Sequence, residues 1–164
     1  MSIKAFVGID NGVTGSIGVI YPDLGTSAFI MTPVIKTRDY TQKEKYFHRI
    51  DWHILQENIP IGSFVLLERP MVDPRRFVAT ASALRALEAT LIVLEMNDLE
   101  YTYIDSKEWQ REFFSSSVIG SKDLKETSMM IAIELFPNHE SKIRKHRDGD
   151  GLLIAEYARR KYGR

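Results

Sequence analysis

Four acidic residues stand where a folded chain can gather them into one cluster. Asp10 and Glu68 each end a short apolar segment, and Asp148 and Asp150 precede an amphipathic one. We expect adjacent strand ends to bring them together. Clustered carboxylates repel one another and raise each other's pKa. A divalent cation compensates their negative charge, and Mg²⁺ and Mn²⁺ prefer such oxygen ligands. Two such ions roughly 3.5 to 4 Å apart activate water against a phosphodiester, so these residues predict phosphoryl hydrolysis.

The simpler interpretation is that these acids are turn or capping residues. Asp10 and Glu68 then belong to surface turns, and Asp148 or Asp150 caps a helix. The segment 8–18 (GIDNGVTGSIG) favours function, because its glycines let a phosphate or a backbone approach the carboxylate. A nucleotide loop like that of sugar-kinase and actin-like ATPases is an alternative, but their second phosphate loop is absent from the sequence.

Hydrophobic periodicity and turn residues predict an α/β fold with helices packed on a mixed sheet. The 164 residues suit one domain, 1–164. Expected strands cover residues 5–9, 16–21, 27–31, 64–67 and 101–104. Expected helices cover residues 41–57 (with Thr41 and Glu44 as a capping box), 81–96, 109–114 (capped by Asp105 or Ser106), 122–135 and 152–162 (begun by Asp148 or Asp150). Expected loops cover residues 36–40, 71–80 and the basic linker 141–147.

Four motifs in this order resemble those of RuvC-like Holliday junction resolvases, which belong to the RNase H-like superfamily, and especially their short phage forms. GIDNGVTGSIG at 8–18 resembles the first-strand motif, with Asn11 where proline is common. LLERP at 66–70 resembles the second motif. YIDSKEW at 103–109 resembles the strand-to-helix segment with a lysine and often a tryptophan, and DGLLIAEY at 150–157 resembles the final acidic helix.

The resemblance implies an RNase H-like fold with a five-stranded mixed sheet, three antiparallel strands followed by parallel ones, flanked by helices. It implies that Asp10, Glu68 and Asp150 hold two Mg²⁺ ions, for which Mn²⁺ substitutes, and that Lys107 contacts the scissile phosphate. Trp109 is expected to pack beneath Lys107. The implied activity is cleavage of branched DNA in recombination and repair.

One position departs from the family pattern. The family usually has a further Asp or His three residues before the last acid, and here that residue is Arg147. Asp148 is our first candidate to replace it, in which case the helix must begin between Asp148 and Asp150 or after them. His146 is the alternative, as a metal ligand or a proton donor to the leaving group.

Basic residues adjoin the acids although the chain has 22 Lys and Arg against 22 Asp and Glu. We expect them to neutralise DNA phosphates, with solvated charged loops as the alternative. They are Arg69, Arg75 and Arg76 after Glu68, and Lys142, Arg144, Lys145, His146 and Arg147 before Asp148. Phe77 or Met71 is expected to wedge between bases at a branch point, with core packing as the alternative.

Composition narrows the remaining possibilities. The chain has no cysteine, which excludes disulfides, thiolate metal ligands and cysteine nucleophiles. The start MSIK has no signal-peptide pattern, and the uninterrupted apolar runs are shorter than the ~18 residues of a membrane span. We therefore expect a cytoplasmic protein, in a bacterial host if a phage encodes it.

A four-way junction has approximate two-fold symmetry, so an isologous homodimer suits it, with small and apolar residues of 81–96 as one possible interface. The sequence thus predicts a metal-dependent endonuclease for Holliday junctions. Alternatives are another RNase H-like nuclease for forks, flaps or hybrids, and a junction-binding protein without activity, which the arginine at position 147 would explain.

Overall fold

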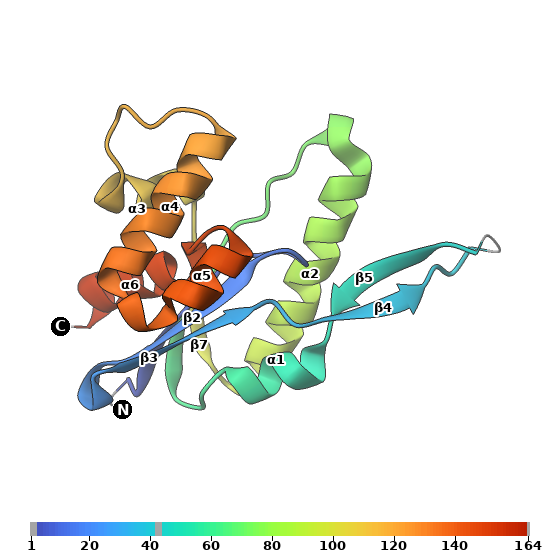
Figure 1. The fold of residues 1–164 in the computed structure, drawn as a ribbon. Coiled ribbons are helices and arrows are strands. Elements are labelled where there is room, and N and C mark those ends of the chain that lie inside the picture. Colours follow the sequence, from blue (N-terminus) through green and yellow to red (C-terminus); the bar gives the residue numbers. More distant parts are fainter. Residues whose placement is uncertain (1–2, 42–43, 164) are drawn as a thin grey trace.

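The computed structural model describes residues 3–41 and 44–163. Its centre is a five-stranded sheet with the strand order β3-β2-β1-β6-β7 (Figure 1). β2 runs antiparallel to β1 and to β3, whereas β6 runs parallel to β1 and to β7. The strands are β1 Ala5–Ile9, β2 Ser16–Tyr21, β3 Thr26–Met31, β6 Ser63–Glu68 and β7 Glu100–Ile104. The predicted mixed sheet is confirmed, with all five of its strands.

Helices cover both faces of the sheet (Figure 1). α1 and α2 lie on one face, and α3 to α6 lie on the other. The helices are α1 Trp52–Asn58, α2 Phe77–Met96, α3 Ser106–Phe113, α4 Ser121–Leu135, α5 Glu140–His146 and α6 Asp150–Tyr162, with short 3-10 turns η1 Pro22–Leu24, η2 Pro74–Arg76 and η3 Pro137–His139. Strand alternation supplies both cores, because Val7 packs toward α2 while its neighbour Phe6 packs toward α6.

Two glycines in register bring α6 directly onto the sheet. Gly8 of β1 pairs with Gly18 of β2. A Cβ at Gly8 would overlap the backbone of Gly151 and Ala155, and a Cβ at Gly18 would overlap Gly151 and Leu152. Only glycine permits this approach, which fixes the first turn of α6 beside the end of β1.

The region between β3 and α1 differs from the prediction. Residues 36–40 were expected as a loop and 41–57 as a helix, but Val34–Arg38 and Tyr46–Ile50 form the antiparallel strands β4 and β5 of a separate two-stranded sheet. Residues 42 and 43 of the expected helix lie outside the described part. The capping box was wrong as well, since α1 is capped by Asp51, whose side chain accepts from Ile54 N at 3.3 Å. Cross-strand pairing outweighed a helical recurrence of few apolar residues.

Three helix assignments also need correction. The basic linker 141–147 is largely the helix α5, which ends at Arg147 in a left-handed conformation with φ 72°. α2 begins at Phe77 rather than at 81, after Asp73 caps the preceding turn. α6 begins at Asp150, so Asp148 precedes it, as required if both acids bind metal.

One helix among the described residues, Pro74–Met96, is long and apolar enough to cross a bilayer by length and composition, with a mean hydropathy of 1.6 over 18 residues. Only 22% of that window is buried. Arg85 and Glu88 interrupt this helix, so it contains no uninterrupted apolar run of about 18 residues.

Candidate metal centre

Asp10 and Glu68 lie side by side at the carboxyl ends of β1 and β6, because these strands are parallel neighbours. Ile9 pairs with Leu67, so the next residues along the two strands are Asp10 and Glu68. The turn after β1 fixes Asp10, whose backbone N–H donates to Ser16 O at 3.0 Å. The carboxyl ends of parallel strands thus present both side chains in the same direction, as predicted.

Asp148 and Asp150 lie at the same end of the sheet, next to the start of α6. Asp10, Asp148 and Asp150 each offer a carboxylate oxygen, and these three oxygens lie within 4.8 Å of one another. Asp148 is buried, with 3% of its surface exposed, whereas the other two are half-buried. Ser16 Oγ accepts from Gly151 N at 3.0 Å and ties the first turn of α6 to β2.

The electrostatics of the cluster favour a bound cation. Burial raises the pKa of Asp10 well above its usual range, and the charges of Asp150, Glu68 and Asp148 raise it further. Burial raises the pKa of Glu68 to about 7, and burial together with the charge of Asp148 raises the pKa of Asp150 to about 6. Asp10, Glu68 and Asp150 therefore resist ionisation, and a divalent ion such as Mg²⁺ or Mn²⁺ would supply the charge that stabilises their carboxylates.

Two hydrogen bonds hold carboxylates of the cluster in place. The indole N–H of Trp109 donates to Glu68 Oε2 at 2.6 Å. Ser128 of α4 donates to Asp150 Oδ1, and its hydroxyl accepts from Gly149 N at 3.1 Å. Ser128 therefore fixes both the last residue before α6 and the first residue of that helix.

No protein-family model matches the chain, and no curated protein matches it. Among solved structures, it superposes on Thermus thermophilus RuvC in complex with a Holliday junction substrate with a TM-score of 0.57 and 15% identity, over 96% of each chain. The fold is that of RuvC. A second Thermus thermophilus RuvC structure gives a TM-score of 0.48 and 13% identity over 95% of each chain. The resemblance of the sequence motifs is thus confirmed at the level of the fold.

Within this RuvC fold, two basic side chains lie beside Asp148. Lys125 Nζ of α4 lies 3.7 Å from Asp148 Oδ2, and His146 Nε2 lies 3.3 Å from Asp148 Oδ1 without the geometry of a hydrogen bond. Asp148 rather than His146 shares the three-oxygen cluster. The side chain of Arg147, which occupies the family's usual position for an acid, adds no ligand atom there.

Ser128, Lys125 and the polar contact of Trp109 were not predicted from the sequence. Trp109 was expected only to pack, and it is fully buried, but its N–H also holds Glu68. Lys125 and Ser128 are three residues apart on α4 and so share a helix face. That spacing was the available signal, but the sequence does not say which face meets the carboxylates.

The remaining predicted residues surround the centre without joining it. Lys107 is exposed in the first turn of α3 and has no ion pair within the described ranges. Arg69 pairs with Asp105 at 3.4 Å, and Arg75 pairs with Asp73 at 3.1 Å.

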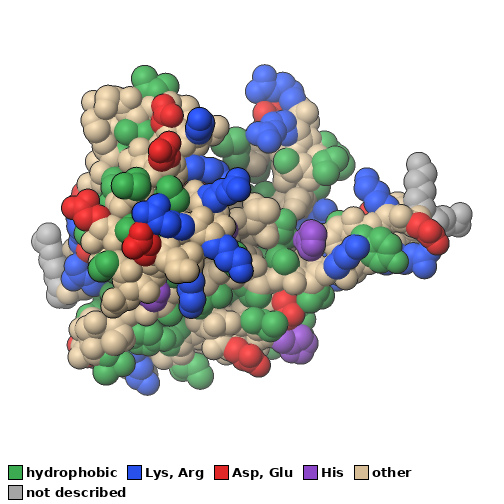
Figure 2. All heavy atoms as spheres, viewed as in Figure 1, with side chains coloured by type: hydrophobic (Ala, Val, Ile, Leu, Met, Phe, Trp, Pro, Cys, Tyr) green, Lys and Arg blue, Asp and Glu red, His purple; other side chains and the backbone are tan. Residues whose placement is uncertain are grey.

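On α5, Arg144 pairs with Glu140 at 2.8 Å. Lys142 and Lys145 lie beside β3. Lys and Arg side chains gather over α4 and α5, at the free end of α2 and along the β4–β5 hairpin on the face shown in Figure 2.

The residues proposed as wedges are not core residues. Phe77 is 75% exposed and Met71 is 76% exposed, which removes the core-packing alternative for both. Met71 and Arg76 line a cavity of about 260 Å³ that reaches Glu68 and Asn11. Asn11 Nδ2 donates to Ala83 O at 3.1 Å and so links the turn after Asp10 to α2.

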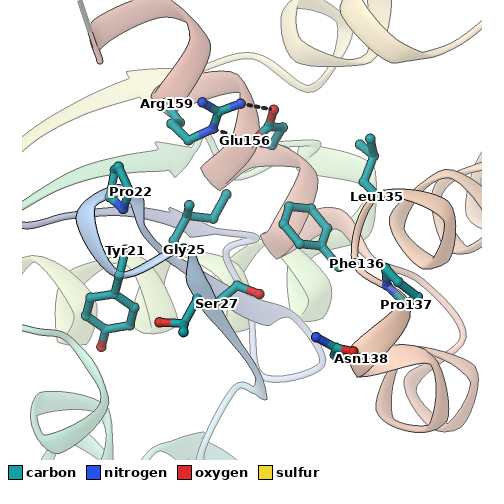
Figure 3. A pocket seen from close by; sticks show the side chains of 12 residues that line it. Tyr21, Pro22, Gly25, Ser27, Leu135, Phe136, Pro137, Asn138, Glu156 and Arg159 are labelled. Carbon is teal, nitrogen blue, oxygen red and sulfur yellow. Dashed lines mark hydrogen bonds and ion pairs between the residues drawn. The ribbon is translucent and has the colours of Figure 1, made fainter.

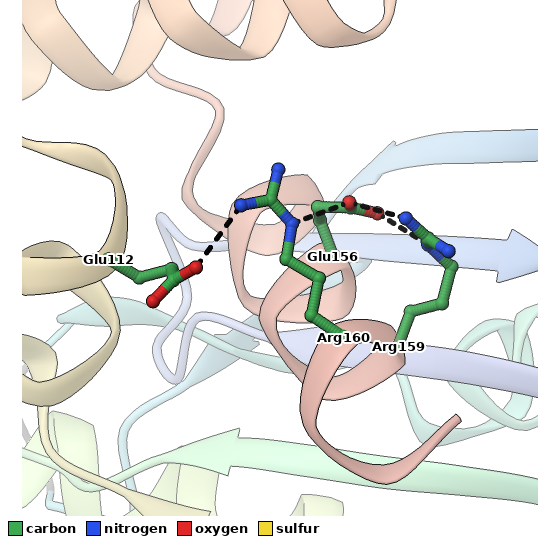
Figure 4. Close-up of polar contacts among 4 residues, drawn as sticks. All are labelled: Glu112, Glu156, Arg159 and Arg160. Atoms are coloured by element: carbon green, nitrogen blue, oxygen red, sulfur yellow. Dashed lines mark hydrogen bonds and ion pairs between the residues drawn. The ribbon is translucent and has the colours of Figure 1, made fainter. Parts of the chain in front are cut away.

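A second cavity, of about 490 Å³, lies at the opposite end of the strands, between the turn after β2 and the end of α4 (Figure 3). Glu156 and Arg159 border it. Glu156 accepts from Arg159 Nη2 at 2.7 Å and from Arg160 Nε at 2.9 Å, and Arg160 continues to Glu112 at 3.2 Å (Figure 4). The carboxylate of Glu156 is compensated by arginines and offers no free charge to a metal.

Proposed function

We propose that this chain is a metal-dependent endonuclease that cuts Holliday junctions and other branched DNA. The observation that carries the proposal is the cluster of Asp10, Asp148 and Asp150, with Glu68 on the neighbouring strand, at the carboxyl ends of β1 and β6 in a RuvC fold. A solved protein of that fold, Thermus thermophilus RuvC, is described in complex with a Holliday junction substrate. The single domain 1–164 would contain the whole site, and the expected compartment is the cytoplasm.

The four carboxylates would hold two divalent ions, Mg²⁺ by preference. When bound, such ions supply charge that activates a water and stabilises the leaving oxygen of a phosphodiester. Trp109 and Ser128 would keep Glu68 and Asp150 oriented toward the centre. Lys125 lies at the centre already, while Lys107 would approach the scissile phosphate from α3.

The basic residues around the centre would bind the DNA backbone. Arg69, Arg75 and Arg76 stand on one side of Glu68, and the cations of α5 stand on the side of Asp148. Phosphate contacts of this kind give affinity that depends on salt and little on sequence, which suits recognition by DNA shape. The exposed Phe77 or Met71 would insert at the branch point.

A homodimer would give the two sites that a four-way junction requires. α2 supports this part of the proposal because its exposed side chains include Val78, Leu84, Ile92 and Met96. An apolar helix that leaves such side chains exposed in one chain suits burial against a second copy. Light scattering would give twice the mass of the chain.

The test is cleavage of a labelled four-way junction beside a matched linear duplex, with Mg²⁺ or with EDTA. We expect paired nicks on the junction alone, loss of cleavage with EDTA or Asp10→Asn, and retained junction binding by that variant. Asp98→Asn is the matched control. Asp98 precedes β7 at the end of the sheet away from the carboxylates, and its φ of 51° is one that asparagine also adopts.

The other outcomes distinguish the alternatives. Cleavage of forks, flaps or hybrids as readily as junctions would assign a general nuclease of this fold. Junction binding without cleavage under any divalent ion would assign a binding protein. Unchanged cleavage by Asp10→Asn would remove the carboxylate cluster from the mechanism.

A further inference from the structure

The β4–β5 hairpin projects from the molecule and takes no part in the five-stranded sheet (Figure 1). Two-stranded hairpins are at best marginally stable alone, so another element must support this one. The support is α2, because the guanidinium of Arg85 lies over the ring of Phe47 at 4.3 Å. Phe47 and its cross-strand partner Thr37 are half-buried and define the inner face of the hairpin.

The opposite face of the hairpin is the more exposed one, although Arg38 and His48 also border a cavity between the hairpin and α2. Register places Lys36 opposite His48 and Arg38 opposite Tyr46, and all four side chains are exposed. We call these four residues the outer face. Lys36 Nζ lies 4.9 Å from the ring centre of Tyr46, so cation and aromatic ring form one surface.

Charge is separated along the hairpin. The strands Val34–Arg38 and Tyr46–Ile50 contain Lys36, Arg38 and Arg49 but no Asp or Glu. The acids Asp39 and Glu44 lie beyond the strand ends, toward the tip. Since the whole chain has no net charge, this basic and acid-free face is a local feature that suits a polyanion.

The root of the hairpin is connected to the metal centre. Thr32, between β3 and β4, donates its N–H to Gly15 O at 3.0 Å, in the turn that positions Asp10. Asp51 N donates to Pro33 O at 2.9 Å and closes the base of the hairpin. The hairpin therefore leaves the sheet at the end of the strands where the carboxylates lie.

We propose that the outer face binds the phosphate backbone of a duplex arm of the DNA substrate, away from the cleaved bond. Lys36 and Arg38 are two residues apart, which is about 6.8 Å along a β-strand and equals the rise of about two base pairs, 3.4 Å each, along the axis of B-DNA. The five-residue strands extend about 16 Å, roughly half a turn of B-DNA. Tyr46 adds contact area beside the sugars.

This inference rests on the proposed function, and its test separates the two. Junction binding is measured in EDTA between 50 and 300 mM salt for wild type, Lys36→Gln, Arg38→Gln and the double variant. Each lost phosphate contact should lower the slope of log affinity against log salt by about 0.9 and weaken binding on the order of tenfold at 0.1 M salt. Cleavage at saturating protein should stay within twofold of wild type.

Lys4→Gln is the matched control. Lys4 is exposed next to Gly62, at the end of the sheet away from the hairpin, so its loss should leave the slope unchanged. Equal slopes for wild type and the double variant, with wild type bound, would overturn the role of the hairpin alone. Absence of wild-type binding would overturn the proposed function and this inference with it. A double variant that loses its dimer but keeps its slope would assign the outer face to a second copy of the chain instead.

Discussion

Trp109 holds Glu68 through a hydrogen bond of 2.6 Å from its indole N–H to Oε2. The tryptophan is a fully buried residue of α3, so its donor has a fixed direction. This bond lowers the pKa of Glu68 while burial raises it, and burial dominates. Removal of the donor should therefore make Glu68 harder to ionise.

We predict that Trp109→Phe shifts the acidic limb of the pH–rate profile upward by about half to one pH unit. The profile is measured on saturating junction with Mg²⁺. Phe113→Leu on the same helix tests for a mere packing effect and should lower stability without moving the limb. An unshifted profile for Trp109→Phe would show that Glu68 ionisation does not limit the acidic side.

Metal-free protein should lose stability as pH rises from about 4.5 to about 7. Over this range folded Glu68, with its pKa near 7, holds a proton that the unfolded chain releases near 4.5. The folded state then binds more protons, so the free energy of unfolding falls with increasing pH. Asp150, with a pKa of about 6, contributes in the same direction.

Mg²⁺ should reverse this loss, raising Tm by several degrees at pH 8 and by less at pH 5.5, since about 1 kcal/mol corresponds to 2–4 °C at this size. Differential scanning calorimetry measures both. Glu156→Gln is the contrasting variant. Burial raises the pKa of Glu156, but hydrogen bonds from Arg159 and Arg160 outweigh burial, so the pKa of this carboxyl lies below its usual value. It should lose about 1–3 kcal/mol of stability, mainly at neutral pH, without changing the Mg²⁺ effect.

Ser128→Ala should weaken divalent metal binding by roughly 10- to 100-fold, because Asp150 loses the hydroxyl that orients it. Gly149 N also loses its acceptor, so stability should fall by about 1–2 kcal/mol. Calorimetric Mn²⁺ titration measures the affinity. Ser121→Ala, at an exposed position of α4, should change neither quantity; equal affinities for the two variants would contradict the positioning role of Ser128.

Arg147→Gly should have opposite effects on stability and on DNA binding. Arg147 has φ 72°, where glycine costs less, so the variant should gain about 0.5–1 kcal/mol in denaturant unfolding. If Arg147 binds a phosphate, the salt slope of junction binding should fall by about 0.9. A gain in stability with an unchanged slope would leave Arg147 as a helix-ending residue only.

The sequence alone was sufficient for the five sheet strands, most helices and the places of the four acids at strand ends and before a helix, because these depend on local patterns. Short apolar segments ended by Asp10 and Glu68 define strand ends, and glycines at 8 and 18 mark a close backbone approach. The β4–β5 hairpin was missed because its few apolar residues also match a helical period.

Tertiary structure decided what surrounds those acids. Ser128 and Lys125 meet α6 only after α4 packs against it, and no local signal says which helix face does so. Trp109 was correctly expected to be buried, but the direction of its N–H depends on the placement of α3 against β6. Asp148 joins the three-oxygen cluster because α6 begins at Asp150 over Gly8 and Gly18. The sequence determined which groups are present, and contacts between distant segments determined which of them act together.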